Sequence, residues 1–228
     1  MTRQTTQANE SSRTHLAIVL DRSGSMEPIR DDVIGGFNAF LASQQAETSA
    51  ATLTLVQFDG QDPYEVLADH ADVHAVSPLT RETFVPRGAT PLLDAMGRCI
   101  LDTELWIARQ PADTRPDHVV FVIITDGQEN ASREFKLGRV KSLLKAKEKL
   151  GWQFIFLSAD LAAFDDAEEL GIAQEKRAFF SKDAAGNREA FARTSSKITM
   201  LRRRELEDIG YDEADRQAMA GDKPPAAS

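Results

Sequence analysis

The sequence has 228 residues, with a formal net charge of −9 at pH 7 and a pI near 5.0. A chain of this length suits a single α/β domain with short tails. Its acidic balance argues against a nucleic-acid partner, because binding to phosphates needs a concentrated basic face. The single cysteine, Cys99, excludes an intramolecular disulfide and a cysteine-based zinc site.

The two ends of the sequence are polar or charged. No stretch approaches the ~20 apolar residues that a membrane-spanning helix needs, and residues 1–13 lack the apolar core of a secretory signal. We therefore expect a soluble protein of the cytoplasm with no membrane partner. Residues 1–13 are expected to be a disordered lead, residues 14–204 the folded domain, and residues 205–228 a charged, flexible tail.

Apolar runs alternate along the chain with apolar residues at helical spacing. The runs predict strands over residues 15–20, 52–58, 118–125, 152–158 and 178–180, and one or two short edge strands over residues 64–67 and 73–76. Helical spacing predicts helices near residues 28–45, 91–108, 135–150, 162–170 and 187–204. This order predicts a doubly wound, Rossmann-like α/β fold. It would have a mostly parallel central sheet, helices on both faces and one short antiparallel edge strand.

Two of the expected strands stop at an aspartate. The first is followed by Asp21, and the unbroken apolar run over residues 118–125 is followed by Asp126. Such a run is typical of a parallel strand that is buried on both faces. Open α/β sheets bind ligands at the carboxyl ends of their strands. Two carboxylates brought together there would repel one another, and a divalent cation between them would remove that cost.

Hydroxyl groups complete an oxygen-rich set of candidate ligands. Ser23 and Ser25 alternate in the glycine-containing loop after Asp21, and Thr90 lies in a third loop. Taken alone, the serines are also explained by ordinary Asx and Ser turns. Hard cations such as Mg²⁺ prefer oxygen ligands and usually keep some waters. The sequence therefore predicts a metal site for Mg²⁺, with Mn²⁺ or Ca²⁺ as alternatives, built from Asp21, Ser23, Ser25, Thr90 and Asp126.

These three loops resemble the metal-ion-dependent adhesion site (MIDAS) of von Willebrand factor type A (VWA) domains, also called integrin I domains. The matching segments are DRSGSM at residues 21–26, GATPL at 88–92 and ITDG at 124–127. The resemblance covers residues 14–200 and departs from the family pattern at no metal-site position. It implies that the two serines bind the metal directly and that the threonine binds directly or through water. The two aspartates would act mostly through bridging waters.

The resemblance implies a non-catalytic module whose metal binds an Asp or Glu carboxylate of a partner protein. It is closest in kind to the stand-alone intracellular bacterial members, which often work beside ATPases or in stress-response assemblies. The alternative is a Mg²⁺-dependent phosphohydrolase of the haloacid-dehalogenase type, which also places an aspartate after its first strand. That chemistry needs a second acid two residues later, where this chain has Ser23, and Asp165-Asp166 lies in an expected helix. No Gly-x-Gly-x-x-Gly follows the first strand, which excludes a dinucleotide-binding domain.

The other notable residues are given structural roles. Cys99 lies on an apolar helical face and is expected in the core. His70 and His74 are four residues apart but in a turn and edge-strand region, so they are not expected to form a helical metal pair. The basic run Arg202–Arg204 is expected to be a solvated face at a helix end. Four side chains are expected on the rim of the metal face, namely Arg22, Glu27, Glu129 and Asn130.

Overall fold

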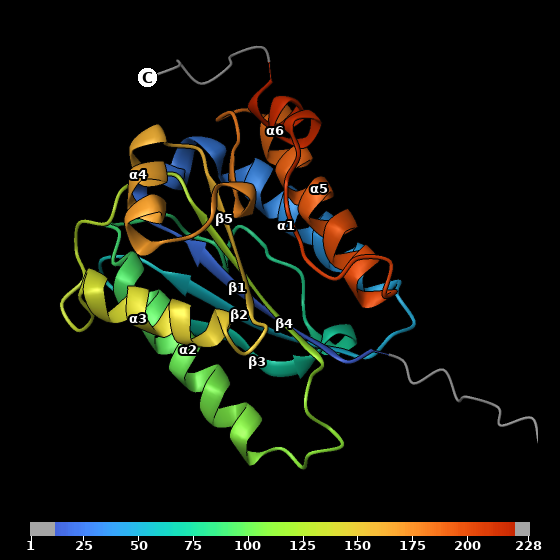
Figure 1. The fold of residues 1–228 in the computed structure, drawn as a ribbon. Helices are drawn as coiled ribbons and strands as arrows, with labels where there is room; N and C mark the ends of the chain where they lie inside the picture. The colour runs from blue at the N-terminus through green and yellow to red at the C-terminus, as the bar shows by residue number, and fades with distance from the viewer. Residues whose placement is uncertain (1–11, 222–228) are drawn as a thin grey trace, which may run out of the picture.

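A computed structural model describes residues 12–221 and contains one six-stranded sheet in the order β3-β2-β1-β4-β5-β6 (Figure 1). Only β2 and β3 pair antiparallel, and all other neighbours pair in parallel. This confirms the doubly wound α/β fold with an antiparallel edge strand. The strands are β1 (Thr14–Asp21), β2 (Ala51–Phe58), β3 (Glu65–Asp72), β4 (His118–Thr125), β5 (Gln153–Ser158) and β6 (Arg177–Phe179).

Helices cover both faces of the sheet, with α1, α5 and α6 on one face and α2, α3 and α4 on the other (Figure 1). Within the described residues, no helix is long and apolar enough to cross a bilayer. The helices are α1 (Arg30–Gln45), α2 (Leu92–Arg109), α3 (Leu137–Glu148), α4 (Leu161–Leu170), α5 (Ala184–Arg202) and α6 (Glu213–Ala220). Short 3₁₀ turns are η1 (Gly24–Ile29), η2 (Val73–Ala75) and η3 (Gln174–Lys176).

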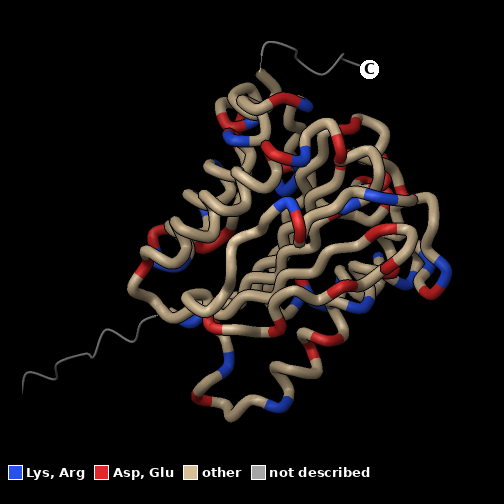
Figure 2. The backbone as a smooth tube through the Cα atoms, turned by 180° about the vertical axis from the view of Figure 1, so that it is seen from behind, with Lys and Arg blue, Asp and Glu red and all other residues tan. Residues whose placement is uncertain are grey.

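The sheet separates two apolar cores. Because successive side chains of a strand point to opposite faces, Leu16, Ile18 and Leu20 of β1 pack toward α1 and α5, whereas Ala17 and Val19 pack toward α2 and α3. Strand β4 alternates in the same way. Burial on both faces explains why these strands are unbroken apolar runs in the sequence. Charged residues lie mainly on the surrounding helices and loops (Figure 2).

The chain beyond residue 204 differs from the expected flexible tail. Ile209, Tyr211 and Met219 are buried in the core on the α1–α5 face, and the Tyr211 hydroxyl lies 2.6 Å from Thr194 Oγ1. Helix α6 begins with a capping box at Asp212. These apolar residues are separated by charged ones and form no periodic pattern, so the sequence alone does not reveal their packing.

The expected lead and tail lie partly outside the described residues, which leave out 1–11 and 222–228. The end of the lead is part of the fold, because Ser12 is buried and the carbonyl oxygen of Arg13 accepts a hydrogen bond of 2.8 Å from Asp117 N. The ordered domain therefore extends beyond the expected 14–204 at both ends.

The first residue of the basic run Arg202–Arg204, at the end of α5, does not lie on a solvated face, contrary to the expectation. Arg202 is buried, and its guanidinium donates to the carbonyl oxygens of Gln44 at 2.7 Å and Ser49 at 2.6 Å. These carbonyls lie at and just beyond the carboxyl end of α1, where a cation is favourable. Arg203 pairs with Glu47 in the same region. The two arginines fix the end of α5 against the end of α1.

Candidate metal centre

Two aspartates meet where the winding of the sheet reverses. Strands β1 and β4 are parallel neighbours, with Leu20 opposite Ile124, although the chain visits β2 and β3 between them. Asp21 ends β1 and Asp126 follows β4, so both carboxylates reach the same edge. Ligands of open α/β sheets bind at this switch point. Both aspartates are buried.

Hydrogen bonds join the first loop to the loop after β4. The hydroxyls of Ser23 and Ser25 are hydrogen bonded at 3.0 Å, and Ser25 Oγ donates to Asp126 Oδ1 at 2.5 Å. Asp21 accepts from the backbone N–H of Ser23 and from the Thr125 hydroxyl, each at 2.6 Å. Burial raises the pKa of Asp21 to about 6, despite these hydrogen bonds. The two hydrogen bonds hold the Asp21 carboxylate in one orientation.

The third loop brings Thr90 to the same edge. Its backbone N–H donates to Asn130 Oδ1 at 2.9 Å, and its carbonyl accepts from Asn130 N at 3.1 Å. A Cβ placed on Gly127 would lie 3.6 Å from Thr90 Oγ1 and 3.4 Å from Ser25 Oγ. The two hydroxyls therefore both face Gly127, and a glycine leaves the space between them free.

The donor set fits a hard divalent cation. It consists of two carboxylates and three hydroxyls, all of them oxygen ligands. Asp126 Oδ2 is buried and receives no hydrogen bond of good geometry within residues 12–221, although the Lys182 ammonium lies 3.2 Å from it. No group of three or more His, Cys, Asp or Glu in that range could hold a metal. A metal here would therefore depend on the hydroxyls of Ser23, Ser25 and Thr90.

Neither a family model nor a curated protein matches the sequence. Solved structures do match. A von Willebrand factor type A protein from Catenulispora acidiphila matches with a TM-score of 0.52 and 18% identity, over 83% of this chain and 43% of that one. The manganese-loaded TRAP protein of Plasmodium vivax matches with a TM-score of 0.59 and 16% identity, over 83% of this chain and 74% of that one.

The chain has the VWA fold. A third VWA-like match is proximal thread matrix protein 1 from the mussel byssus with a zinc-occupied MIDAS motif, with a TM-score of 0.52 and 14% identity. That match covers 84% of this chain and 46% of the mussel chain. This chain thus spans less than half of the Catenulispora and mussel structures. At these identities the likeness establishes the fold.

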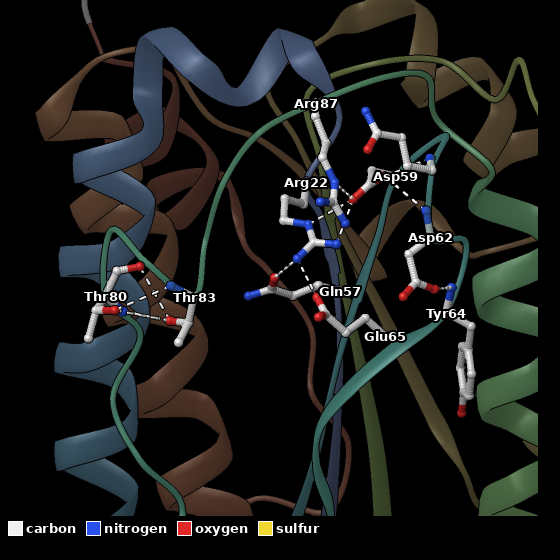
Figure 3. Close-up of polar contacts among 10 residues, drawn as sticks. Arg22, Gln57, Asp59, Asp62, Tyr64, Glu65, Thr80, Thr83 and Arg87 are labelled. Carbon is white, nitrogen blue, oxygen red and sulfur yellow. Dashed lines mark hydrogen bonds and ion pairs between the residues drawn. The ribbon is translucent and has the colours of Figure 1, made fainter.

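Within the VWA fold, the Arg22 side chain does not lie on the rim of the metal face but points toward Asp59 and Gln57 (Figure 3). Its side chain is only 4% exposed and donates to Asp59 Oδ2 at 2.8 and 2.6 Å and to Gln57 Oε1 at 3.0 Å. It also pairs with Glu65 of β3. Arg22 therefore ties the loop between Asp21 and Ser25 to the neighbouring strands β2 and β3.

Asp59 is the buried anion of this cluster. Burial opposes its ionisation, but N–H groups of Asp62 and Gln61 and the guanidiniums of Arg22 and Arg87 hold its pKa below the usual value. Residue 59 follows β2 directly, and Phe58 is opposite Asp21 in the sheet. In the sequence, Asp59 stands directly after an expected strand, as Asp21 and Asp126 do. The spacing of the residues did not show that its partner is Arg22.

Glu129 and Asn130 position the VWA loops and are not free rim side chains. Asn130 holds Thr90, as described above. Glu129 accepts from the backbone N–H of Leu93 at 2.8 Å, at the N-terminus of α2 where an anion is stabilised. In return, Asp94 of α2 accepts from three backbone N–H groups of the loop after β4, at residues 133–135. This reciprocal contact fixes the Thr90 loop relative to the Asp126 loop.

The other residues singled out in the sequence lie in different surroundings. Glu27 is exposed near the first loop, and Cys99 is buried in the core. His70 and His74 bond to acids on β3, Asp69 and Asp72 respectively, and not to one another.

One residue at the edge of the site could not be recognised from the sequence. It is Lys182, from the loop between β6 and α5, whose ammonium contacts Asp126.

Proposed function

We propose that the chain is a non-catalytic, metal-dependent protein-binding module. The observation that carries the proposal is the meeting of five oxygen-bearing side chains from three loops at the β1–β4 switch point, beside a buried carboxylate oxygen that receives no hydrogen bond. Mg²⁺ is the proposed metal in the cell, with Mn²⁺ as a substitute. Ser23 and Ser25 would bind the metal directly, Thr90 directly or through water, and Asp21 and Asp126 mostly through bridging waters.

A bound divalent cation would supply a positive charge with coordination positions left for an outside oxygen. Hydroxyl ligands are neutral and leave much of the cation's charge uncompensated, so an incoming carboxylate would bind strongly. Ser25 is exposed whereas Ser23 and Asp21 are buried, so one side of the site is open to a partner. The proposed partner is a protein that offers an Asp or Glu side chain.

The contacts of Asp21 argue against the phosphohydrolase alternative. Both of its oxygens already accept hydrogen bonds, from Ser23 N–H and Thr125 Oγ1. The position two residues later is a serine, which cannot protonate a leaving group near neutral pH. Asp166 lies in α4 and accepts a hydrogen bond from Glu129 N at 3.0 Å, so it is engaged with the loop after β4. These contacts favour a binding role.

For its place in the cell, we propose the cytoplasm and an assembly of several proteins, with an ATPase or a stress-response complex as the kind of partner. The resemblance of the three loops to the VWA metal site supports a role in an assembly, since stand-alone intracellular VWA proteins often work beside ATPases or in stress-response assemblies. The proposal also agrees with a lone, buried cysteine, which needs no oxidising compartment.

Thermal melting with Mn²⁺ or Mg²⁺ and with EDTA tests the metal site. We expect either metal to raise the Tm of the wild type, because a ligand that binds only the folded state stabilises it. Ser25→Ala and Asp126→Asn should lose this rise. Ser142→Ala, an exposed serine of α3, is the matched control and should keep it. A metal-dependent rise that is unchanged in both site variants would overturn the proposed metal site.

Affinity capture tests the binding role. The immobilised wild-type chain should retain proteins in Mg²⁺ that EDTA releases, and the Ser25→Ala chain should retain none of these. If all retained proteins remain bound in EDTA, metal-bridged binding is the wrong mechanism.

A further inference from the structure

Lys182 places a positive charge at the proposed metal centre. Its Nζ lies 3.2 Å from Asp126 Oδ2 and donates to the backbone carbonyl oxygen of Asp126 at 3.1 Å. Oδ2 is the buried oxygen that receives no hydrogen bond of good geometry within the described residues. The lysine side chain is 43% exposed, whereas the Asp126 carboxylate is fully buried. The lysine therefore compensates a buried charge from the solvent side.

The loop that carries Lys182 is held on both sides. Before it, Phe180 N donates to the carbonyl oxygen of Ser158 in β5 at 2.9 Å, and Ser181 N donates to the carbonyl oxygen of Met219 in α6 at 3.0 Å. After it, the Asp183 carboxylate accepts from Gly186 N at 2.8 Å and caps α5.

The fit of this loop is also tight. A Cβ on Gly186 would lie 2.3 Å from Ser181 Oγ and 2.6 Å from Ser181 N and O, so only a glycine can approach this closely. The backbone at Lys182 is thus fixed by β5, α5 and α6. The long side chain alone remains free to move.

A divalent cation and this ammonium cannot both compensate Asp126 at full strength. Two positive charges a few ångströms apart repel one another, and the repulsion is only partly screened beside a buried carboxylate. The metal cannot be accommodated by moving Asp126, which is buried and bonded to Ser25. Lys182 can move, because its side chain is long and partly exposed. Binding of a metal would therefore drive the lysine outward.

We infer that Lys182 is a resident counter-ion of Asp126 which a divalent cation must displace, so that this lysine sets the metal affinity of the site. The inference rests on the proposed metal-dependent function. It makes Lys182 a positioning residue with opposite effects in the two states. Without metal it stabilises the fold, and with metal its charge opposes the bound cation. A purely structural lysine would stabilise both states.

Calorimetric titration with Mn²⁺ tests the inference in three variants of the full chain. Lys182→Met should bind Mn²⁺ about tenfold more tightly than the wild type, because a nearby positive charge is removed. Lys182→Arg keeps the charge and should stay close to the wild type. Lys145→Met removes an exposed lysine of α3, so it changes the net charge equally and should stay within about twofold of the wild type.

Thermal melting of the same proteins gives a second readout. Lys182→Met should melt below the wild type in EDTA and above it in saturating Mn²⁺. If the wild type binds Mn²⁺ and Lys182→Met binds it with the same or a weaker affinity, the inference is overturned and the proposed function still stands. A Tm of Lys182→Met below that of the wild type both in EDTA and in saturating Mn²⁺ would also overturn the inference alone. Absence of Mn²⁺ binding by both the wild type and Lys182→Met would overturn the proposed function and the inference together.

Discussion

Replacement of Arg22 by methionine should destabilise the chain and loosen the first metal loop. The guanidinium makes two hydrogen bonds to Asp59 Oδ2 and one to Gln57 Oε1, and the Asp59 side chain is fully buried. Removing one partner of a buried ion pair costs about 3–5 kcal/mol, because the other charge is left uncompensated. Arg87 remains 3.0 Å from the same Asp59 oxygen, so we expect the lower value, about 3 kcal/mol.

Urea unfolding at pH 7 in EDTA measures this loss. With a slope of about 2–3 kcal/mol per M urea, a loss of about 3 kcal/mol lowers the midpoint by about 1 M. Arg81→Met is the matched control, because Arg81 pairs with Asp31 at the surface, with side chains 68% and 59% exposed. It should change the midpoint far less, since exposed ion pairs contribute little. An Arg22→Met midpoint as high as that of Arg81→Met would refute the assigned role of the buried pair.

Two further predictions concern burial and packing. Burial and the neighbouring His70 lower the pKa of His15 to about 3, so between pH 6.5 and pH 3 the unfolded chain binds the extra proton. From pH 7 to pH 5 the wild type should therefore lose about 2 kcal/mol more stability than His15→Gln, measured by urea unfolding at both pH values; equal losses would contradict this. In α1, a Cβ on Gly36 would lie 2.2 Å from Phe191 Cδ2, whereas a Cβ on Gly35 meets nothing within 4 Å. Gly36→Ala should cost about 1–3 kcal/mol through overpacking, and Gly35→Ala should add about 0.5–1 kcal/mol through helix propensity; a gain at both positions would show that the close contact does not restrict the site.

The fold could be predicted from the sequence because its strands are buried on both faces. The run at 118–125 matches β4 to the residue, since a strand between two apolar cores is apolar on both faces, here over residues 119–124. The position of the three loops was also predictable, because two of them follow recognisable strands and the third precedes a recognisable helix. The parallel neighbours β1 and β4 then bring Asp21 and Asp126 to one edge.

What could not be predicted are contacts that join distant segments. Arg22 was expected on the rim because its neighbours face the metal, but its side chain turns to Asp59, whose position depends on the sheet register. Lys182 reaches Asp126 across 56 positions, from a loop whose composition is ordinary. Helix α6 is short and charged, and it is ordered by tertiary packing that local propensity does not report.

Helix α6 also determines how the domain would respond to mechanical load. Its eight residues are held to α5 by the ion pairs of Asp215 with Arg193 and Lys197, and its carbonyl at Met219 is bonded to Ser181. A pull on the chain beyond Ala220 would reach this short helix before any strand of the sheet. Peeling it away would break the bond to Ser181 and slacken the turn that presents Lys182 to Asp126. Tension at this end of the chain would thus pass from α6 to the loop of Lys182, beside the edge where β1 and β4 end.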